Sequence, residues 1–128
     1  MENEKVFAMA FAKVYPLLIA KAERKGRTRG EVLEVTSWLT GYSAEEIERM
    51  LESDIAYGDF FRGAPALNPK RVLIKGSICG VKVELIENPL MQDIRRLDKM
   101  VDELAKGKAM EKILTNACSC NNVSSSAN

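Results

Sequence analysis

The stretch VTSWLTGYSAEEIERMLESDI, residues 35–55, has a second copy further along the chain, where residues 74–94 read IKGSICGVKVELIENPLMQDI. Aligned to each other, the two segments share identical residues at Gly41/Gly80, Glu45/Glu84, Ile47/Ile86, Glu48/Glu87, Leu51/Leu90, Asp54/Asp93 and Ile55/Ile94. Unrelated segments of this length would share roughly one residue at ordinary frequencies. We interpret the pattern as a duplicated unit: an apolar helix end, a glycine turn, and a second helix with an acidic start.

The first copy carries clear helix boundaries. Thr28 with Glu31, and Ser43 with Glu46, are capping boxes, in which a hydroxyl and a carboxylate satisfy free backbone amides at a helix start. Gly41 lies between the two predicted helices, and a glycine tolerates the positive φ at which many helices end. The sequence therefore predicts a helix-turn-helix unit with Gly41 as its structural turn.

The second copy satisfies two patterns at once. Its β-branched residues and the alternation across Val81, Val83 and Leu85 are typical of a β-hairpin. The repeat predicts a second helix-turn-helix unit with Gly80 as its structural turn. We follow the repeat, and an α+β arrangement with a hairpin at about residues 72–86 is the alternative.

The flanking segments also favour helices. Asn88-Pro89 reads as an N-cap followed by proline at the first helical position. It opens a long amphipathic helix whose apolar residues alternate spacings of four and three: Leu90, Ile94, Leu97, Val101 and Leu104. Residues 4–25 are rich in helix formers but contain Pro16, which predicts a kink or a new helix at Tyr15-Pro16.

These elements predict an all-α domain with two tandem helix-turn-helix units and a long C-terminal amphipathic helix. At 128 residues the chain is expected to form one domain, residues 1–115. The polar tail NACSCNNVSSSAN, within residues 116–128, is expected to be disordered because it has little to bury.

Composition limits the function classes. The formal net charge of +1 argues against an obligate polyanion binder. No apolar run approaches the roughly 20 residues of a membrane span, so no membrane partner is expected. The start of the chain is a poor signal peptide, and three cysteines do not make a disulfide framework. We therefore expect a cytoplasmic protein.

Several longer motifs stand out along the chain: FAKVYP, ERKGRT, WLTGY, APALNP, ICG and NPLMQDIRRLDKMVDELAKGKAMEKIL. Together they resemble a family of short bacterial proteins known as domain of unknown function 2200, and the resemblance covers about residues 9–114. It implies a stand-alone bacterial domain and no particular activity. Val81 and Arg96 depart from the pattern, since aromatic residues are expected at both positions.

Catalytic chemistry finds little support in the sequence. The chain has no histidine, which excludes a serine hydrolase and a zinc site built on histidine. Cys79 reads as a small buried hydrophobe, and Cys118 with Cys120 fall short of four zinc ligands. Asp98, Asp102 and Glu103 leave a carboxylate-only metal site as an alternative to a solvated helix face. We expect no catalytic residues, cofactor or metal.

One cluster of residues is a candidate binding site for a ligand or a phosphate. Its members lie within nine residues at a predicted helix end and the start of the next helix: Lys21, Arg24, Lys25, Arg27, Thr28 and Arg29. Cations and a helix N-terminus together bind phosphates well. The structural alternative is a solvated helix end whose cations complement the helix dipole.

The sequence thus favours a non-enzymatic interaction or small-molecule-binding domain. A homodimer is expected because the first predicted helix and the long C-terminal helix both present broad apolar faces. The alternative is a monomer in which these two helices cover each other. A nucleic-acid-binding module that uses residues 21–29 is the alternative function.

Overall fold

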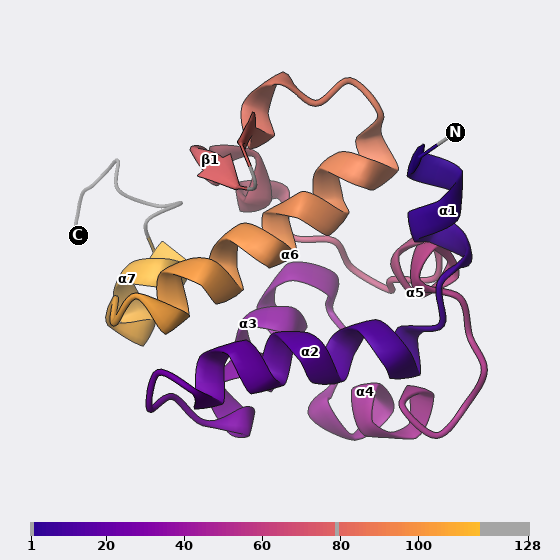
Figure 1. Cartoon of the computed structure of the whole chain (residues 1–128), viewed down its shortest axis with the longest axis horizontal. Coiled ribbons are helices and arrows are strands. Elements are labelled where there is room, and N and C mark those ends of the chain that lie inside the picture. Colours follow the sequence, from indigo (N-terminus) through magenta and orange to yellow (C-terminus); the bar gives the residue numbers. More distant parts are fainter. Residues whose placement is uncertain (1, 79, 116–128) are drawn as a thin grey trace.

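The computed structural model describes residues 2–78 and 80–115, and within them it contains seven α-helices, two 3₁₀ helices and one hairpin (Figure 1). In chain order the elements are α1 (Glu2–Ala8), α2 (Phe11–Glu23), α3 (Arg29–Thr40), α4 (Ala44–Met50), α5 (Tyr57–Arg62), η1 (Pro69–Leu73), β1 (Ser77–Ile78), β2 (Val81–Lys82), η2 (Val83–Leu85), α6 (Pro89–Ala105) and α7 (Met110–Thr115). The predicted all-α class is confirmed, with the hairpin of the alternative added to it.

Helix α6 is the central element. It crosses the whole molecule in Figure 1 and packs against α2, α3, α5, α7, β1 and η2. Its boundaries follow from the sequence: the Asn88 side chain accepts a hydrogen bond from the Met91 amide at 3.0 Å, and Pro89 occupies the first turn. The predicted seam lies inward, with Ile94, Leu97 and Val101 buried. A long helix with one apolar face therefore organises the core.

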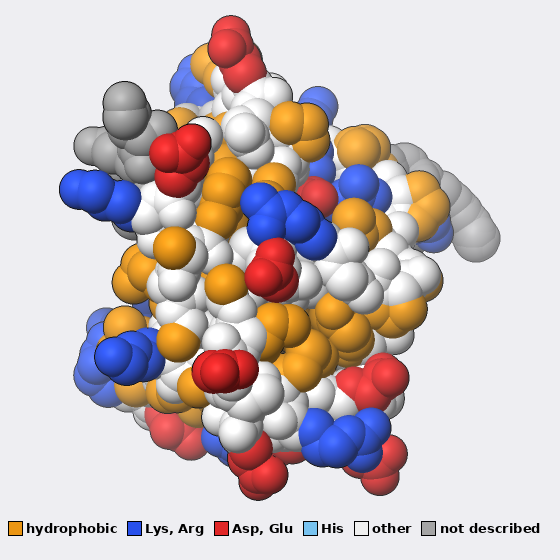
Figure 2. All heavy atoms as spheres, turned by 90° about the vertical axis from the view of Figure 1, so that its right-hand side faces the viewer, with side chains coloured by type: hydrophobic (Ala, Val, Ile, Leu, Met, Phe, Trp, Pro, Cys, Tyr) orange, Lys and Arg blue, Asp and Glu red, His pale blue; other side chains and the backbone are white. Residues whose placement is uncertain are grey.

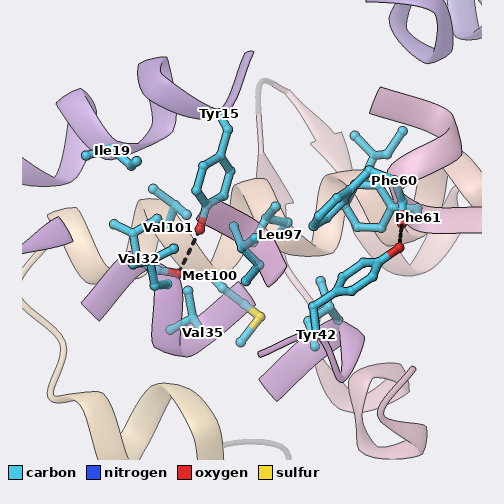
Figure 3. Close-up of a cluster of buried hydrophobic side chains, with 14 of the residues drawn as sticks. Tyr15, Ile19, Val32, Val35, Tyr42, Phe60, Phe61, Leu97, Met100 and Val101 are labelled. Atoms are coloured by element: carbon cyan, nitrogen blue, oxygen red, sulfur yellow. Dashed lines mark hydrogen bonds between the residues drawn. The ribbon is translucent and has the colours of Figure 1, made fainter. Parts of the chain in front are cut away.

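Aromatic rings fill the part of the core between α2 and α5. The Phe11 ring stacks on Tyr15 and on Phe60, at centroid distances of 4.8 and 4.1 Å. Two buried tyrosine hydroxyls have partners: Tyr15 donates to the Val32 carbonyl at 3.3 Å, and Tyr42 donates to the Phe60 carbonyl at 2.8 Å (Figure 3). The Tyr15 hydroxyl also lies 2.7 Å from that of Thr36. The rings thus bury large apolar area while these polar tips remain hydrogen-bonded.

Helices α3 and α4 begin and end where the capping signals predict. Thr28 and Ser43 are the N-caps, and both capping boxes are complete. Gly41 ends α3 with φ of +84°. The Leu39 and Thr40 carbonyls at the end of α3 accept amides of the loop that follows α5. The loop therefore packs directly over the glycine turn.

The prediction of a second helix-turn-helix unit is wrong. In place of a helix before Gly80 the chain forms β1, and after it β2, with Ser77 opposite Lys82 and Ile78 opposite Val81. Gly80 does have a positive φ, +80°, but it lies between strands and not at a helix end. Gly76 adopts φ of +115°, and its amide donates to the Glu84 carboxylate at 3.0 Å. The local β pattern therefore overrides the sequence similarity between the copies.

The interruption of the N-terminal segment also differs from the prediction. Helix α2 continues through Pro16, and the break lies at Met9-Ala10. There the backbone pairs with the segment before α5: the Phe11 amide donates to Ile55, and the Tyr57 amide donates to Met9. A contact between segments distant in sequence thus decides where α1 ends.

The faces that predicted a homodimer are largely buried within the chain. Helix α2 covers α6, with Phe11, Ile19 and Leu104 among the buried residues, although Leu17 stays exposed. Among the residues that the structure describes, no helix combines the length and hydrophobicity that crossing a membrane requires. The predicted tail, 116–128, and Cys79 lie outside the described residues, and so do Cys118 and Cys120.

Candidate functional site

Arg27, the centre of the predicted basic cluster, joins two distant parts of the fold. Its guanidinium donates to both oxygens of Glu31, at 3.1 and 2.9 Å. A third nitrogen donates to the Leu104 and Lys108 carbonyls, at 3.1 and 2.7 Å. These carbonyls belong to the C-terminal end of α6 and the turn after it, where the Leu104 carbonyl also accepts the Gly107 amide. Arg27 therefore ties the start of α3 to the end of α6.

The same contacts shift the acidity of Glu31. Its hydrogen bond from Arg27, together with amide and hydroxyl bonds from Thr28, lowers the pKa of Glu31 from 4.5 to about 2. A carboxylate whose pKa is lower in the folded state stabilises the fold above its unfolded pKa. This contribution is lost as the pH falls from about 4.5 towards 2.

We expect Arg27→Gln to make the free energy of unfolding depend less on pH between pH 2 and 6. Without the guanidinium, the folded pKa of Glu31 moves back towards 4.5, and less stability depends on its ionisation. Urea midpoints between pH 2 and 6 would measure this, with Arg62→Gln as the control because the ion pair of Arg62 with Asp59 is exposed and its other contact is with the Phe7 ring, which does not titrate. Parallel profiles for wild type and Arg27→Gln would contradict the assignment.

The other members of the cluster divide into two groups. Lys21 pairs with Asp102 at 3.1 Å, and Arg29 pairs with Glu48. Thr28 caps α3. Arg24 and Lys25 are exposed and form no ion pair within residues 2–78 and 80–115. The fold thus uses four of the six predicted residues in its own contacts.

The carboxylates of the alternative metal site are also paired with cations. Asp98 accepts from Arg95 at 2.8 Å, Asp102 contacts Lys21 and Lys106, and Glu103 contacts Lys99 and Lys108. The described residues contain no group of three or more His, Cys, Asp or Glu side chains placed to hold a metal ion.

A different site lies where the N-terminal turns of α6 meet α1 and the end of the hairpin. An open groove of about 720 Å³ is formed there, within the range typical of small-molecule sites. The residues that line it come from four segments of the chain: Asn3, Lys5, Val6, Val81, Ile86, Glu87, Asn88, Met91 and Arg95. Four of these side chains are apolar, and two cations, two amides and one carboxylate provide the polar groups.

Arg95 is the most constrained cation of this groove. Its guanidinium donates to Asp98, one turn along α6, at 2.8 Å. Burial raises the pKa of Asp98, and the Arg95 hydrogen bond opposes that rise. Tyr57 lies close enough to this pair to interact with both charges, and its buried hydroxyl has no hydrogen-bond partner among the described residues. Burial, aided by the charge of Asp98, raises the pKa of Tyr57 well above its usual value.

The side of the molecule that carries α1 and α5 is mixed in character. Figure 2 shows hydrophobic side chains interspersed with acidic and basic ones, without a continuous basic area. Such a surface suits local contacts with a small ligand better than an extended polyanion, which needs many cations in a row.

Sequence reasoning missed this groove. Lys5 and Arg95 are 90 positions apart, and neither belongs to a sequence motif that would indicate a binding site. The N-cap signal of Asn88-Pro89 placed the start of α6 correctly, and it is the one local feature that marks an edge of the groove. The packing of α1 beside that helix start had no counterpart in the sequence pattern.

A buried charge cluster lies further along α6. Asp93 Oδ1 accepts from Arg71 Nε at 2.8 Å and from an Arg96 terminal nitrogen at 2.7 Å. Asp93 and Arg96 are each only 6% exposed, and Arg96 Nε has no partner among the described residues. One buried carboxylate thus compensates two guanidinium groups. One of them belongs to Arg96, which stands where the family resemblance leads us to expect an aromatic residue.

Comparisons with known proteins agree on the family. A search of curated proteins found no significant match. The crystal structure of the uncharacterized protein SP1917 is similar, with 54% sequence identity and a TM-score of 0.86 over 89% of this chain and 93% of that chain. The family model described as "Uncharacterized protein conserved in bacteria (DUF2200)" matches residues 5–115. The chain therefore belongs to the DUF2200 family of bacterial proteins.

Proposed function

We propose that the protein is a cytoplasmic small-molecule-binding module, and that its ligand carries an anionic group on an apolar body. The observation that supports this is the groove at the start of α6, where Arg95 and Lys5 lie beside Val6, Ile86 and Met91. Ligand sites commonly combine a mostly apolar lining with a few placed polar groups.

The two cations have different roles in this proposal. A guanidinium has five N–H donors, so the bond from Arg95 to Asp98 leaves donors for a carboxylate or phosphate. Because Asp98 fixes the Arg95 side chain, little conformational entropy is lost when the ligand binds. Lys5 is exposed and forms no ion pair within the described residues, so it adds a second, mobile positive charge.

Binding without catalysis fits the lining of the groove. Its described side chains include no serine, threonine or cysteine beside a base, the arrangement that nucleophilic catalysis requires. Self-association is not part of the proposal, because the faces that predicted it pack mainly against each other.

Octanoate, which joins a carboxylate to an eight-carbon chain, is the probe that tests the groove. We expect it to shift the amide NMR signals of residues around the groove, and we expect acetate or 1-octanol alone to bind more weakly. A hydrogen bond to a charged group contributes about 1.5–3 kcal/mol. Arg95→Gln and Lys5→Gln are therefore each expected to weaken octanoate binding about tenfold or more.

Arg62→Gln serves as the matched control, since it removes an exposed cation outside the groove lining and should leave binding unchanged. Lys5→Gln keeps the test independent of folding, because Lys5 forms no ion pair in the described part of the chain. Octanoate that shifts other regions, or that binds both groove variants as tightly as wild type, would refute the proposal.

Nucleic-acid binding through residues 21–29 stays a prediction and is not the function proposed here. Of the five cations in that cluster, Lys21, Arg27 and Arg29 already have carboxylate partners. Within the described residues only Arg24 and Lys25 have no carboxylate partner. Two cations can neutralise few phosphates of a nucleic-acid backbone.

A further inference from the structure

A second pocket lies at the opposite end of α6, at the turn into α7. It has a volume of about 600 Å³, and four of its seven lining residues are lysines. The lining residues are Lys99, Glu103, Lys106, Gly107, Lys108, Ala109 and Lys112. Neither the predicted basic cluster nor the groove at the start of α6 includes any of them. The pocket is therefore a separate site.

Two neighbouring carboxylates hold the lysines in place, and each is shared. Glu103 Oε2 lies 3.9 Å from Lys99 Nζ and 3.3 Å from Lys108 Nζ. Asp102 contacts Lys106 at 3.0 Å and Lys21 at 3.1 Å, one through each oxygen. Burial raises the pKa of Asp102, but the bonds from these two lysines outweigh that and leave its pKa below the usual value. Asp102 is therefore held as an anion.

The charges at this pocket do not balance. Each of the two carboxylates faces two ammonium groups, and Lys112 adds another positive charge to the lining. The Lys99 side chain is only 12% exposed, yet its contacts are the 3.9 Å pair and a 3.3 Å bond to the Ser77 carbonyl. A mostly buried ammonium normally has close anionic partners. The lining thus carries four lysines and one glutamate, a formal excess of three positive charges.

The tertiary structure concentrates this charge at one end of the molecule. Figure 1 shows the turn between α6 and α7 near the loop that joins α2 to α3. Lys21, in the last turn of α2, pairs with Asp102, and Arg27, in that loop, donates to the Lys108 carbonyl. Arg24 and Lys25 lie in the same loop region and add to the local positive potential.

We propose that this pocket binds a ligand with two adjacent phosphate groups, such as a diphosphate ester. A diphosphate carries a charge close to the excess that the lysines present, and its oxygens can accept bonds from several ammonium groups at once. Because one short segment, residues 99–112, lines the whole pocket, it suits a compact ligand better than a long backbone. The proposal does not depend on the groove at the other end of α6.

Inorganic pyrophosphate is the probe, measured by isothermal titration calorimetry against the full chain at fixed ionic strength. We expect wild type to bind it more tightly than acetate or chloride. Lys108→Gln/Lys112→Gln, which removes two pocket charges, is expected to weaken binding at least tenfold. Lys13→Gln/Lys82→Gln makes the same change in net charge on exposed residues outside the pocket and should leave binding unchanged.

Glu103→Gln is expected to change the pyrophosphate affinity in the opposite direction. Removing this carboxylate frees Lys99 and Lys108 and takes a repelling charge out of the pocket, so pyrophosphate should bind more tightly. A merely structural role for the lysines would not produce that gain.

Three results would overturn the proposal. The first is no pyrophosphate binding by wild type. The second is an equal loss in the two double variants, which would indicate a general charge effect. The third is tight binding of a 12-nucleotide DNA strand that pyrophosphate does not displace, which would indicate recognition of a nucleic-acid backbone instead.

Discussion

Asp93→Asn is expected to destabilise the protein by about 3–5 kcal/mol, the usual cost of removing one partner from a buried ion pair. The substitution keeps the shape of the side chain but removes the charge that faces Arg71 and Arg96. The loss of the negative charge destabilises the Arg96 guanidinium most, because its side chain is only 8% exposed and its Nε already lacks a partner among the described residues. Urea unfolding at neutral pH measures the change in the free energy of unfolding.

Arg96→Met is the comparison that isolates the cause. It removes the second guanidinium, leaves Asp93 paired one-to-one with Arg71, and places an apolar side chain where an unpartnered nitrogen was buried. Replacing buried charges by apolar side chains is often neutral or stabilising. We expect the stability of this variant to lie within about 1 kcal/mol of wild type or above it.

The double variant completes the cycle. Asp93→Asn/Arg96→Met leaves one partly exposed arginine without its partner, so it should be more stable than Asp93→Asn alone. If Arg96→Met proved as damaging as Asp93→Asn, Arg96 would be a net stabilising residue, and the account of one carboxylate serving two guanidinium groups would fail.

Gly41→Ala is expected to have the second large effect, a loss of about 2–5 kcal/mol, from backbone strain and overpacking together. At φ of +84° any side chain strains the backbone. A Cβ at this position would also lie 2.8 Å from the Ala66 Cβ and amide nitrogen and 2.9 Å from its carbonyl oxygen. The amide of Ala66 donates to Thr40, so the loop cannot move away without losing a bond that caps α3.

Gly26→Ala provides the matched control. Gly26 has nearly the same φ, +85°, but nothing lies within 4 Å of the position that its Cβ would take. It should therefore show only the backbone strain, about 1–2 kcal/mol. Thermal and urea unfolding of both variants would measure the difference, which reports the close approach of the loop. Equal losses would show that the loop adapts and that only the backbone conformation matters at Gly41.

The sequence by itself determined where α3, α4 and α6 begin. Capping boxes at Thr28 and Ser43, and the cap-then-proline signal at Asn88, each placed a helix start correctly. The apolar spacing along residues 90–104 predicted the central helix and its buried face. These signals succeed because a cap acts on amides two or three residues away, and one helix face is defined within a few turns. Their physics is local, so neighbouring residues are enough to specify it.

The hairpin shows where sequence similarity misleads. Identical residues in the two copies have different surroundings: Ile47 is fully buried and Ile86 only partly, while Asp54 is exposed and Asp93 is buried against two arginines. In the second copy, β-branched residues favour strands, and the positive φ of Gly76 excludes a continuous helix at that position. Short apolar runs discriminate poorly between helix and strand, and here the local pattern was the better guide.

Only the tertiary structure decided which charges are available for binding. Arg27 was predicted to face a phosphate, but the end of α6 supplies the carbonyls that it binds, some 80 residues further along the chain. The groove likewise joins side chains near residue 5 to side chains of residues 81–95, whereas the lysine pocket is lined by residues 99–112 alone. Whether a cation stabilises the fold or binds a ligand depends on the nearest anion or carbonyl in space. Coulomb interactions follow that distance and not separation along the chain.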